Sequence, residues 1–80
     1  MTINDKIEKI QSAARTLTGL YWRWLDEKDY EDIEEYGAVI SSTLGFPVKM
    51  TKRPFGFKFD GGRADIKGSS RATLRIYTAH

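Results

Sequence analysis

Residues 44–59, LGFPVKMTKRPFGFKF, contain the change of period that decides the fold of this chain. Up to Leu44 the apolar residues recur at the three- and four-residue steps of a helix. Gly45 followed by Pro47 predicts that this helix ends there, because glycine suits a left-handed cap and proline prevents resumption. Beyond Pro47 the period falls to two, and Phe55–Phe59 places an aromatic ring at every second position. The sequence therefore predicts helices before this stretch and β-strands after it.

Turn signals divide the second half of the chain into four short alternating runs. The signals are Arg53-Pro54, Asp60-Gly61-Gly62 and Gly68-Ser69-Ser70. The inward-facing residues of the four runs are Val48 and Met50; Phe55, Phe57 and Phe59; Ala64 and Ile66; and Ala72, Leu74 and Ile76. Strands joined by tight turns predict an antiparallel meander whose apolar face must be covered by another layer.

The first half of the chain predicts two helices. One begins near Thr2–Asp5, where the two residues have the spacing of a capping box. Its apolar stripe is Ile7, Ile10, Ala14, Leu17, Tyr21 and Trp24, widened by Ile3, Ala13 and Leu20. A strand over Leu20–Leu25 is the alternative, because this run is rich in β-prone residues. The second helix is expected from about Tyr30 to Leu44, with Asp29 as its cap and apolar positions at Ile33, Tyr36, Val39, Ile40 and Leu44.

We therefore expect a single α+β domain over residues 1–80, in which a helical hairpin packs on a four-stranded antiparallel meander (α-α-β-β-β-β). Eighty residues are near the lower size at which one core suffices, and the chain has no cysteine for disulfides or thiolate metal sites. The N-terminus has no continuous apolar run typical of a signal peptide, and no stretch is long enough to span a membrane. These features predict a cytoplasmic protein that uses no metal or cofactor.

Arg53–Phe59 is similar to the first signature of the RNA-recognition motif, a basic residue followed by alternating glycines and aromatics on a central strand. Pro54 and Lys58 depart from that signature, and the helix-first order departs from that family's β-α-β start. We therefore expect the three phenylalanines to form core and not a base-stacking platform.

The charges are segregated along the chain. Residues 1–45 carry 5 Lys/Arg and 9 Asp/Glu, a net charge of −4, whereas residues 46–80 carry 8 and 2, a net charge of +6. Together they give the net charge of +2 for the chain. Such segregation points to charged macromolecular partners and says little about the fold.

Six of the eight Lys/Arg residues in 46–80 are expected on the outward face of the predicted sheet. The candidate residues are Lys49, Lys58, Arg63, Lys67, Arg71 and Arg75, with Tyr77 among them. These cations could neutralise phosphates while Tyr77 stacks on a base, giving a DNA- or RNA-binding module. The alternative is structural, because a half-buried sheet needs polar residues outside and Lys and Arg discourage edge aggregation.

The acids concentrate in the ten residues 26–35, which contain seven of them. The candidate contacts to a partner are Asp26, Asp29, Glu31, Glu34 and Glu35, with Trp22 as an aromatic anchor if the helix continues through it. The run could also be the solvated start of a helix, with its acids favoured by the helix dipole. In its short length, lack of cysteine and concentrated acids the chain resembles small phage inhibitor proteins, including anti-CRISPR proteins. This resemblance implies that the acidic block occupies the nucleic-acid groove of another protein.

No catalytic constellation is apparent. The one histidine is the terminal His80, and the serines have no neighbour that would activate a nucleophile. We favour a non-enzymatic interaction protein that inhibits or modulates a nucleic-acid-handling complex, with direct nucleic-acid binding as the alternative. Because the two charged patches are opposite in sign, two copies of the chain could also pair as a homodimer.

Overall fold

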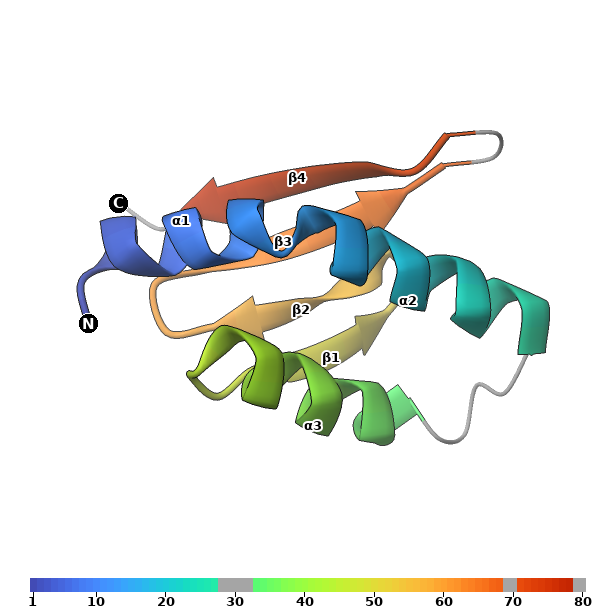
Figure 1. Cartoon of the computed structure of the whole chain (residues 1–80), viewed down its shortest axis with the longest axis horizontal. Helices are drawn as coiled ribbons and strands as arrows, with labels where there is room; N and C mark the ends of the chain where they lie inside the picture. The colour runs from blue at the N-terminus through green and yellow to red at the C-terminus, as the bar shows by residue number, and fades with distance from the viewer. Residues whose placement is uncertain (28–32, 69–70, 79–80) are drawn as a thin grey trace.

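The computed structural model describes residues 1–27, 33–68 and 71–78. Three helices precede an antiparallel sheet of four strands, which confirms the predicted α+β architecture. The elements are α1 (Ile3–Ser12), α2 (Ala14–Glu27), α3 (Ile33–Leu44), β1 (Lys49–Lys52), β2 (Phe55–Phe59), β3 (Gly62–Lys67) and β4 (Thr73–Thr78). The helices form one layer over one face of the sheet, with α3 running opposite to α1 and α2 (Figure 1).

The helix predicted from Thr2 onward is divided at Ala13 into α1 and α2. Ala13 has φ −93° and ψ 7°, and its N–H is shared between the carbonyl oxygens of Lys9 and Ile10. The N–H of Leu17 donates to the Ala13 carbonyl at 2.9 Å, so the helical ladder resumes at once. Residues 20–25 lie in α2, and the strand alternative for Leu20–Leu25 is therefore wrong.

The predicted start of the first helix and the predicted end of the last helix are both confirmed. Thr2 caps α1 in a capping box: the Asp5 N–H donates to the Thr2 hydroxyl at 3.2 Å, and the Thr2 N–H donates to the Asp5 carboxylate at 3.1 Å. α3 ends at Leu44, and Gly45 follows with φ 82°. The Gly45 N–H donates to the Ser41 carbonyl at 2.8 Å, which gives the α3 terminus a left-handed glycine cap. The predicted start of this helix near Tyr30, with Asp29 as cap, lies outside the described residues.

We expect the capping box to be visible in the titration of Asp5. The backbone N–H of Thr2 and then its side chain hold the pKa of Asp5 below its ordinary value of 3.8. Because the pKa is lowered in the folded chain, the stabilisation is present above pH 3.8 and is lost as the pH falls through the lowered value. A pH titration of the Asp5 side-chain carboxyl carbon by NMR should show this lowered pKa. In Thr2→Ala the pKa of Asp5 should return toward 3.8. An Asp5 pKa that is the same in both proteins would contradict the capping box.

Two hydrogen bonds join α1 and α2 to the residues before and after β3. Lys6 Nζ donates to the carbonyl oxygen of Asp60, before the strand, at 3.0 Å. The Tyr21 hydroxyl donates to the carbonyl oxygen of Gly68, after the strand, also at 3.0 Å. These hydrogen bonds fix the direction in which the helices cross the sheet and leave the opposite sheet face open.

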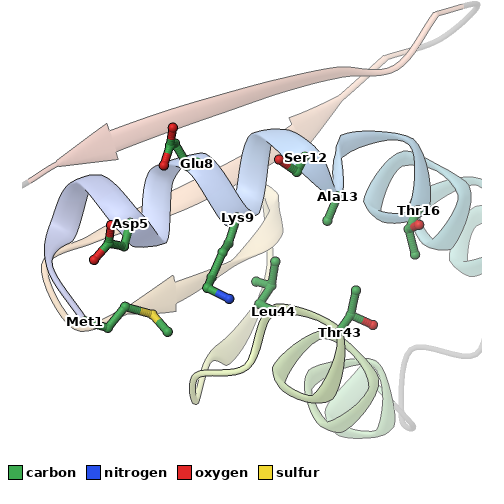
Figure 2. A pocket seen from close by; sticks show the side chains of 9 residues that line it. All are labelled: Met1, Asp5, Glu8, Lys9, Ser12, Ala13, Thr16, Thr43 and Leu44. Atoms are coloured by element: carbon green, nitrogen blue, oxygen red, sulfur yellow. The ribbon is translucent and has the colours of Figure 1, made fainter.

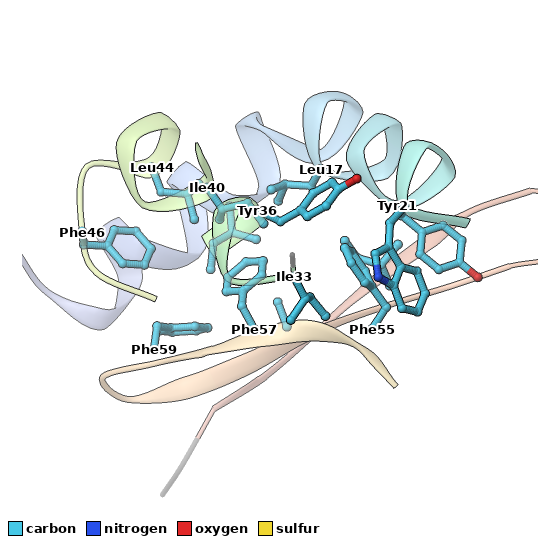
Figure 3. Close-up of a cluster of buried hydrophobic side chains, with 14 residues drawn as sticks. Leu17, Tyr21, Ile33, Tyr36, Ile40, Leu44, Phe46, Phe55, Phe57 and Phe59 are labelled. Carbon is cyan, nitrogen blue, oxygen red and sulfur yellow. The ribbon is translucent and has the colours of Figure 1, made fainter. Parts of the chain in front are cut away.

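The core lies between the two layers and is rich in aromatic rings (Figure 3). Phe55, Phe57 and Phe59 are all buried, as expected from the departures from the RNA-recognition signature. Phe57 is fully buried, and Phe55 packs against Trp24 with ring centroids 4.7 Å apart. The phenylalanine stripe therefore belongs to the core and leaves no stacking platform.

Two residues placed in the predicted apolar stripes are exposed. Val39 is 48% exposed, because the buried stripe of α3 runs through Ile33, Tyr36, Ile40 and Leu44 and turns Val39 to its outer flank. Ile3, in the first turn of α1, lies at the end of the core and is also exposed. Among the described residues, no helix combines the length and the apolar character needed to cross a membrane.

Candidate functional site

The open face of the sheet carries three cations and one aromatic ring in a single row. Lys49 pairs with Lys58, Lys58 with Arg63, and Arg63 with Tyr77, so the row crosses β1, β2, β3 and β4 in turn. Directly paired residues of antiparallel strands lie on the same face, and neighbouring strands are about 4.8 Å apart, so the row is about 14 Å long. Four of the predicted site residues are thus brought together on one surface.

Two more predicted cations lie on the same face. Arg75 pairs with Asp65 across β3 and β4, and Lys67 pairs with Thr73. Arg71 differs from expectation: β4 begins at Thr73, so Arg71 is exposed in the connection before the strand and is not part of the sheet face. We call Lys49, Lys58, Arg63, Lys67, Arg75 and Tyr77 the basic face.

Arg63 is held in place by two neighbours. Its guanidinium lies 4.8 Å from the centroid of the Tyr77 ring, and its Nε lies 3.7 Å from a carboxylate oxygen of Asp65. Asp65 is only 4% exposed although it points to the open face. Its short side chain lies between the longer Arg63 and Arg75, and Gly56 opposite it on β2 contributes no side chain. The one acid of this surface thus orients an arginine and is itself covered.

A shallow hollow of about 280 Å³ lies at the Tyr77 end of the row. Lys58, Gly62, Arg63, Tyr77 and Thr78 line it, and the Tyr77 side is open because this residue is 40% exposed. Its volume is just below the range of about 300–1,000 Å³ typical of small-molecule sites. Two cations beside an aromatic ring suit a single phosphate and its base better than a buried metabolite.

The residues predicted for a protein partner lie on the helical layer or outside the described residues. Asp26 is exposed near the end of α2, and Glu34 and Glu35 are exposed in the first turn of α3. Asp29 and Glu31 lie in residues 28–32, outside the described ranges. Of the predicted acidic block, the structure thus places Asp26, Glu34 and Glu35 as exposed residues of the helical layer.

Trp22 is the exposed aromatic of α2. It is 38% exposed, whereas its neighbours Tyr21 and Trp24 are buried, as the helical interpretation of this segment predicts. Its ring meets that of Tyr21 edge-on, with centroids 5.4 Å apart, and Tyr21 is anchored on Gly68. Trp22 is therefore a supported, partly exposed ring, as an interface anchor requires.

Another hollow, of about 930 Å³, lies between α1 and the end of α3 (Figure 2). Its charged lining residues are Asp5, Glu8 and Lys9, and Asp5 already serves the capping box. Within the described ranges 1–27, 33–68 and 71–78, no three His, Cys, Asp or Glu side chains are grouped to hold a metal.

The alternation of the sequence predicted the face of these residues but not their alignment across strands. One sequence signal could have given the alignment of β2 with β3. Asp60-Gly61 is a two-residue hairpin connection, with Gly61 at φ 107°. Such a turn pairs Phe59 with Gly62 and therefore Lys58 with Arg63, as observed. The covered position of Asp65 has no comparable sequence signal.

Comparison with protein-family models, curated proteins and solved structures gave no match for this chain. Its function is therefore argued from the chemistry of the basic face.

Proposed function

We propose that this protein binds single-stranded nucleic acid through the basic face. The observation that carries the proposal is the row Lys49–Lys58–Arg63–Tyr77, which aligns three cations with an exposed ring. A single strand offers repeating phosphates to the cations and unpaired bases to the ring, and both contacts are largely independent of sequence.

Pre-organisation of Arg63 supports this proposal. Arg63 contacts both Asp65 and Tyr77, so it loses less side-chain freedom on binding than an arginine without such neighbours. The helices cover only the other sheet face, so a strand of nucleic acid can lie across all four β-strands. Lysines that served only to discourage edge aggregation would not need an aromatic ring and a fixed arginine in their row.

The test is a titration of the protein into fluorescein-labelled single-stranded DNA, single-stranded RNA and duplex DNA, followed by fluorescence anisotropy. With three phosphates neutralised on a single strand, the affinity should fall about 20-fold between about 50 and 200 mM salt. Single strands should bind more tightly than the duplex, because only they expose bases to Tyr77. Absence of binding at low salt, or affinity that does not change with salt, would overturn the proposal.

A second candidate function is favoured by Trp22. An exposed, supported tryptophan on the helical layer, which also carries the exposed Asp26, Glu34 and Glu35, could anchor the protein on a nucleic-acid-handling complex, as the resemblance to phage inhibitor proteins implies. Under this alternative, Trp22→Ala and charge reversal at Glu34 and Glu35 abolish the inhibitory activity, while substitutions in the basic face leave it intact.

A further inference from the structure

The outer edge of β4 has no strand partner among the described elements. The sheet order is β1-β2-β3-β4, so β1 and β4 are the two edges. β1 has four residues and begins and ends with lysine, which is a common protection against edge pairing. β4 has six residues, Thr73–Thr78, with no proline, and its one charged side chain lies on the basic face and not toward the core. The free edge of β4 is thus the less protected of the two.

The apolar side of this edge is incompletely covered. Leu74 and Ile76 belong to the core face of β4, but both are only partly buried, unlike Ala64 and Ile66 on β3. A groove of about 680 Å³ runs beside them, with α1 and α2 as its other wall. The groove shows that the core continues to the edge of the sheet and stops there without a cover.

We propose that β4 pairs with β4 of a second copy of this chain, antiparallel and across a two-fold axis perpendicular to the sheet. The two four-stranded sheets then form one continuous sheet, with the helices of both copies on the same side. Such symmetry requires that one residue of β4 lies opposite itself, so only a few registers exist. The pairing does not depend on the proposed nucleic-acid binding.

The side chains of β4 favour the register centred on Ile76 over the register centred on Arg75. Centring on Arg75 would place two arginines directly opposite each other, which destabilises a sheet. Centring on Ile76 places two isoleucines together at the groove and sets Arg75 opposite the partner's Tyr77 on the basic face. An arginine beside a tyrosine ring is favourable, as the Arg63–Tyr77 contact within one chain illustrates.

This register joins the two basic faces. The partner's Arg75 would lie beside the hollow lined by Lys58, Arg63 and Tyr77 and add a third cation to it. The row of each copy would then continue across the two-fold axis onto the partner's Arg75, two residues along β4 from the end of the partner's own row. A second copy of the chain would thus cover the partly buried Leu74 and Ile76 on the core side of β4 and add a cation to the basic face on the other side.

The first measurement is the mass in solution, by sedimentation equilibrium over a concentration series without nucleic acid. We expect a concentration-dependent shift from the monomer mass of 9.2 kDa to twice that value. A mass of 9.2 kDa throughout the series would overturn the proposal.

The second measurement tests the register with single cysteines, since the chain has none of its own. Ile76→Cys should form an intermolecular disulfide under mild oxidation, because directly opposed residues have Cα atoms about 4.5–5.5 Å apart, within disulfide range. Arg75→Cys is the matched control: in this register its Cα lies about 8 Å from its symmetry mate, too far for a disulfide. Circular dichroism verifies that both variants are folded.

The proposal predicts a disulfide in Ile76→Cys alone, and equal disulfide formation by both variants would overturn the register. Disulfide formation by Ile76→Cys with little by Arg75→Cys supports the pairing. The reverse result would overturn the register, and a dimeric mass with no disulfide in either folded variant would overturn β4 as the interface.

Discussion

Reversal of two charges in the basic row, Lys58→Glu with Arg63→Glu, is expected to weaken binding to single-stranded nucleic acid about 100-fold. The variant removes two phosphate contacts and adds two repulsive carboxylates beside Tyr77 in the middle of the row. The dependence of log affinity on log salt should also become shallower by about 1.4, at about 0.7 for each lost contact. Anisotropy titrations at two salt concentrations measure both effects.

A matched control separates the basic face from net charge. Lys9→Glu with Arg15→Glu changes the net charge by the same amount, but on the helical layer, where both side chains are exposed. This variant should bind nearly as well as the parent chain. Equal loss of affinity in the two variants would contradict a role for the basic face and leave only long-range attraction by net charge.

Truncation of the central core ring, Phe57→Ala, is expected to lower the free energy of unfolding by about 3–5 kcal/mol. Phe57 is fully buried between Met50 on β1 and Ala64 on β3, so its removal leaves a cavity in the middle of the sheet. Native proteins have total stabilities of about 5–15 kcal/mol, so this variant should lose a large part of its stability. Urea denaturation followed by circular dichroism measures the change.

Val39→Ala provides the comparison for this core variant. Val39 is apolar but half exposed on α3, so its truncation should change the free energy of unfolding by no more than about 0.5 kcal/mol. A similar loss in both variants would show that Phe57 is not central to the core. The pair also tests the correction to the predicted stripe, in which Val39 was expected to face inward.

The resemblance of the charge pattern to phage inhibitor proteins and the geometry of the sheet lead to different functions. The resemblance depends on an acidic block of which Asp29 and Glu31 lie outside the described residues. The basic face depends on strand pairings that are all described. We place nucleic-acid binding first because these pairings align three cations with an exposed ring, and protein interaction through Trp22 and the acids second.

Local chemistry in the sequence determined the elements of this protein. The change of period at Pro47 separated helices from strands, Thr2 and Asp5 marked the start of α1, and Gly45 marked the end of α3. These features depend on contacts between residues close in the chain, so the sequence alone carries them. The face of each strand residue followed in the same way, because side chains alternate along a strand.

Only the tertiary structure decided how these elements meet. The outward turn of Val39 and the covered position of Asp65 arise where helices and strands distant in sequence fit together. The row Lys49–Lys58–Arg63–Tyr77 is of the same kind, because three pairings in register are needed to align residues from four strands. Alternation gives the face of a residue but not its neighbour across the sheet, and here the neighbours create the candidate site.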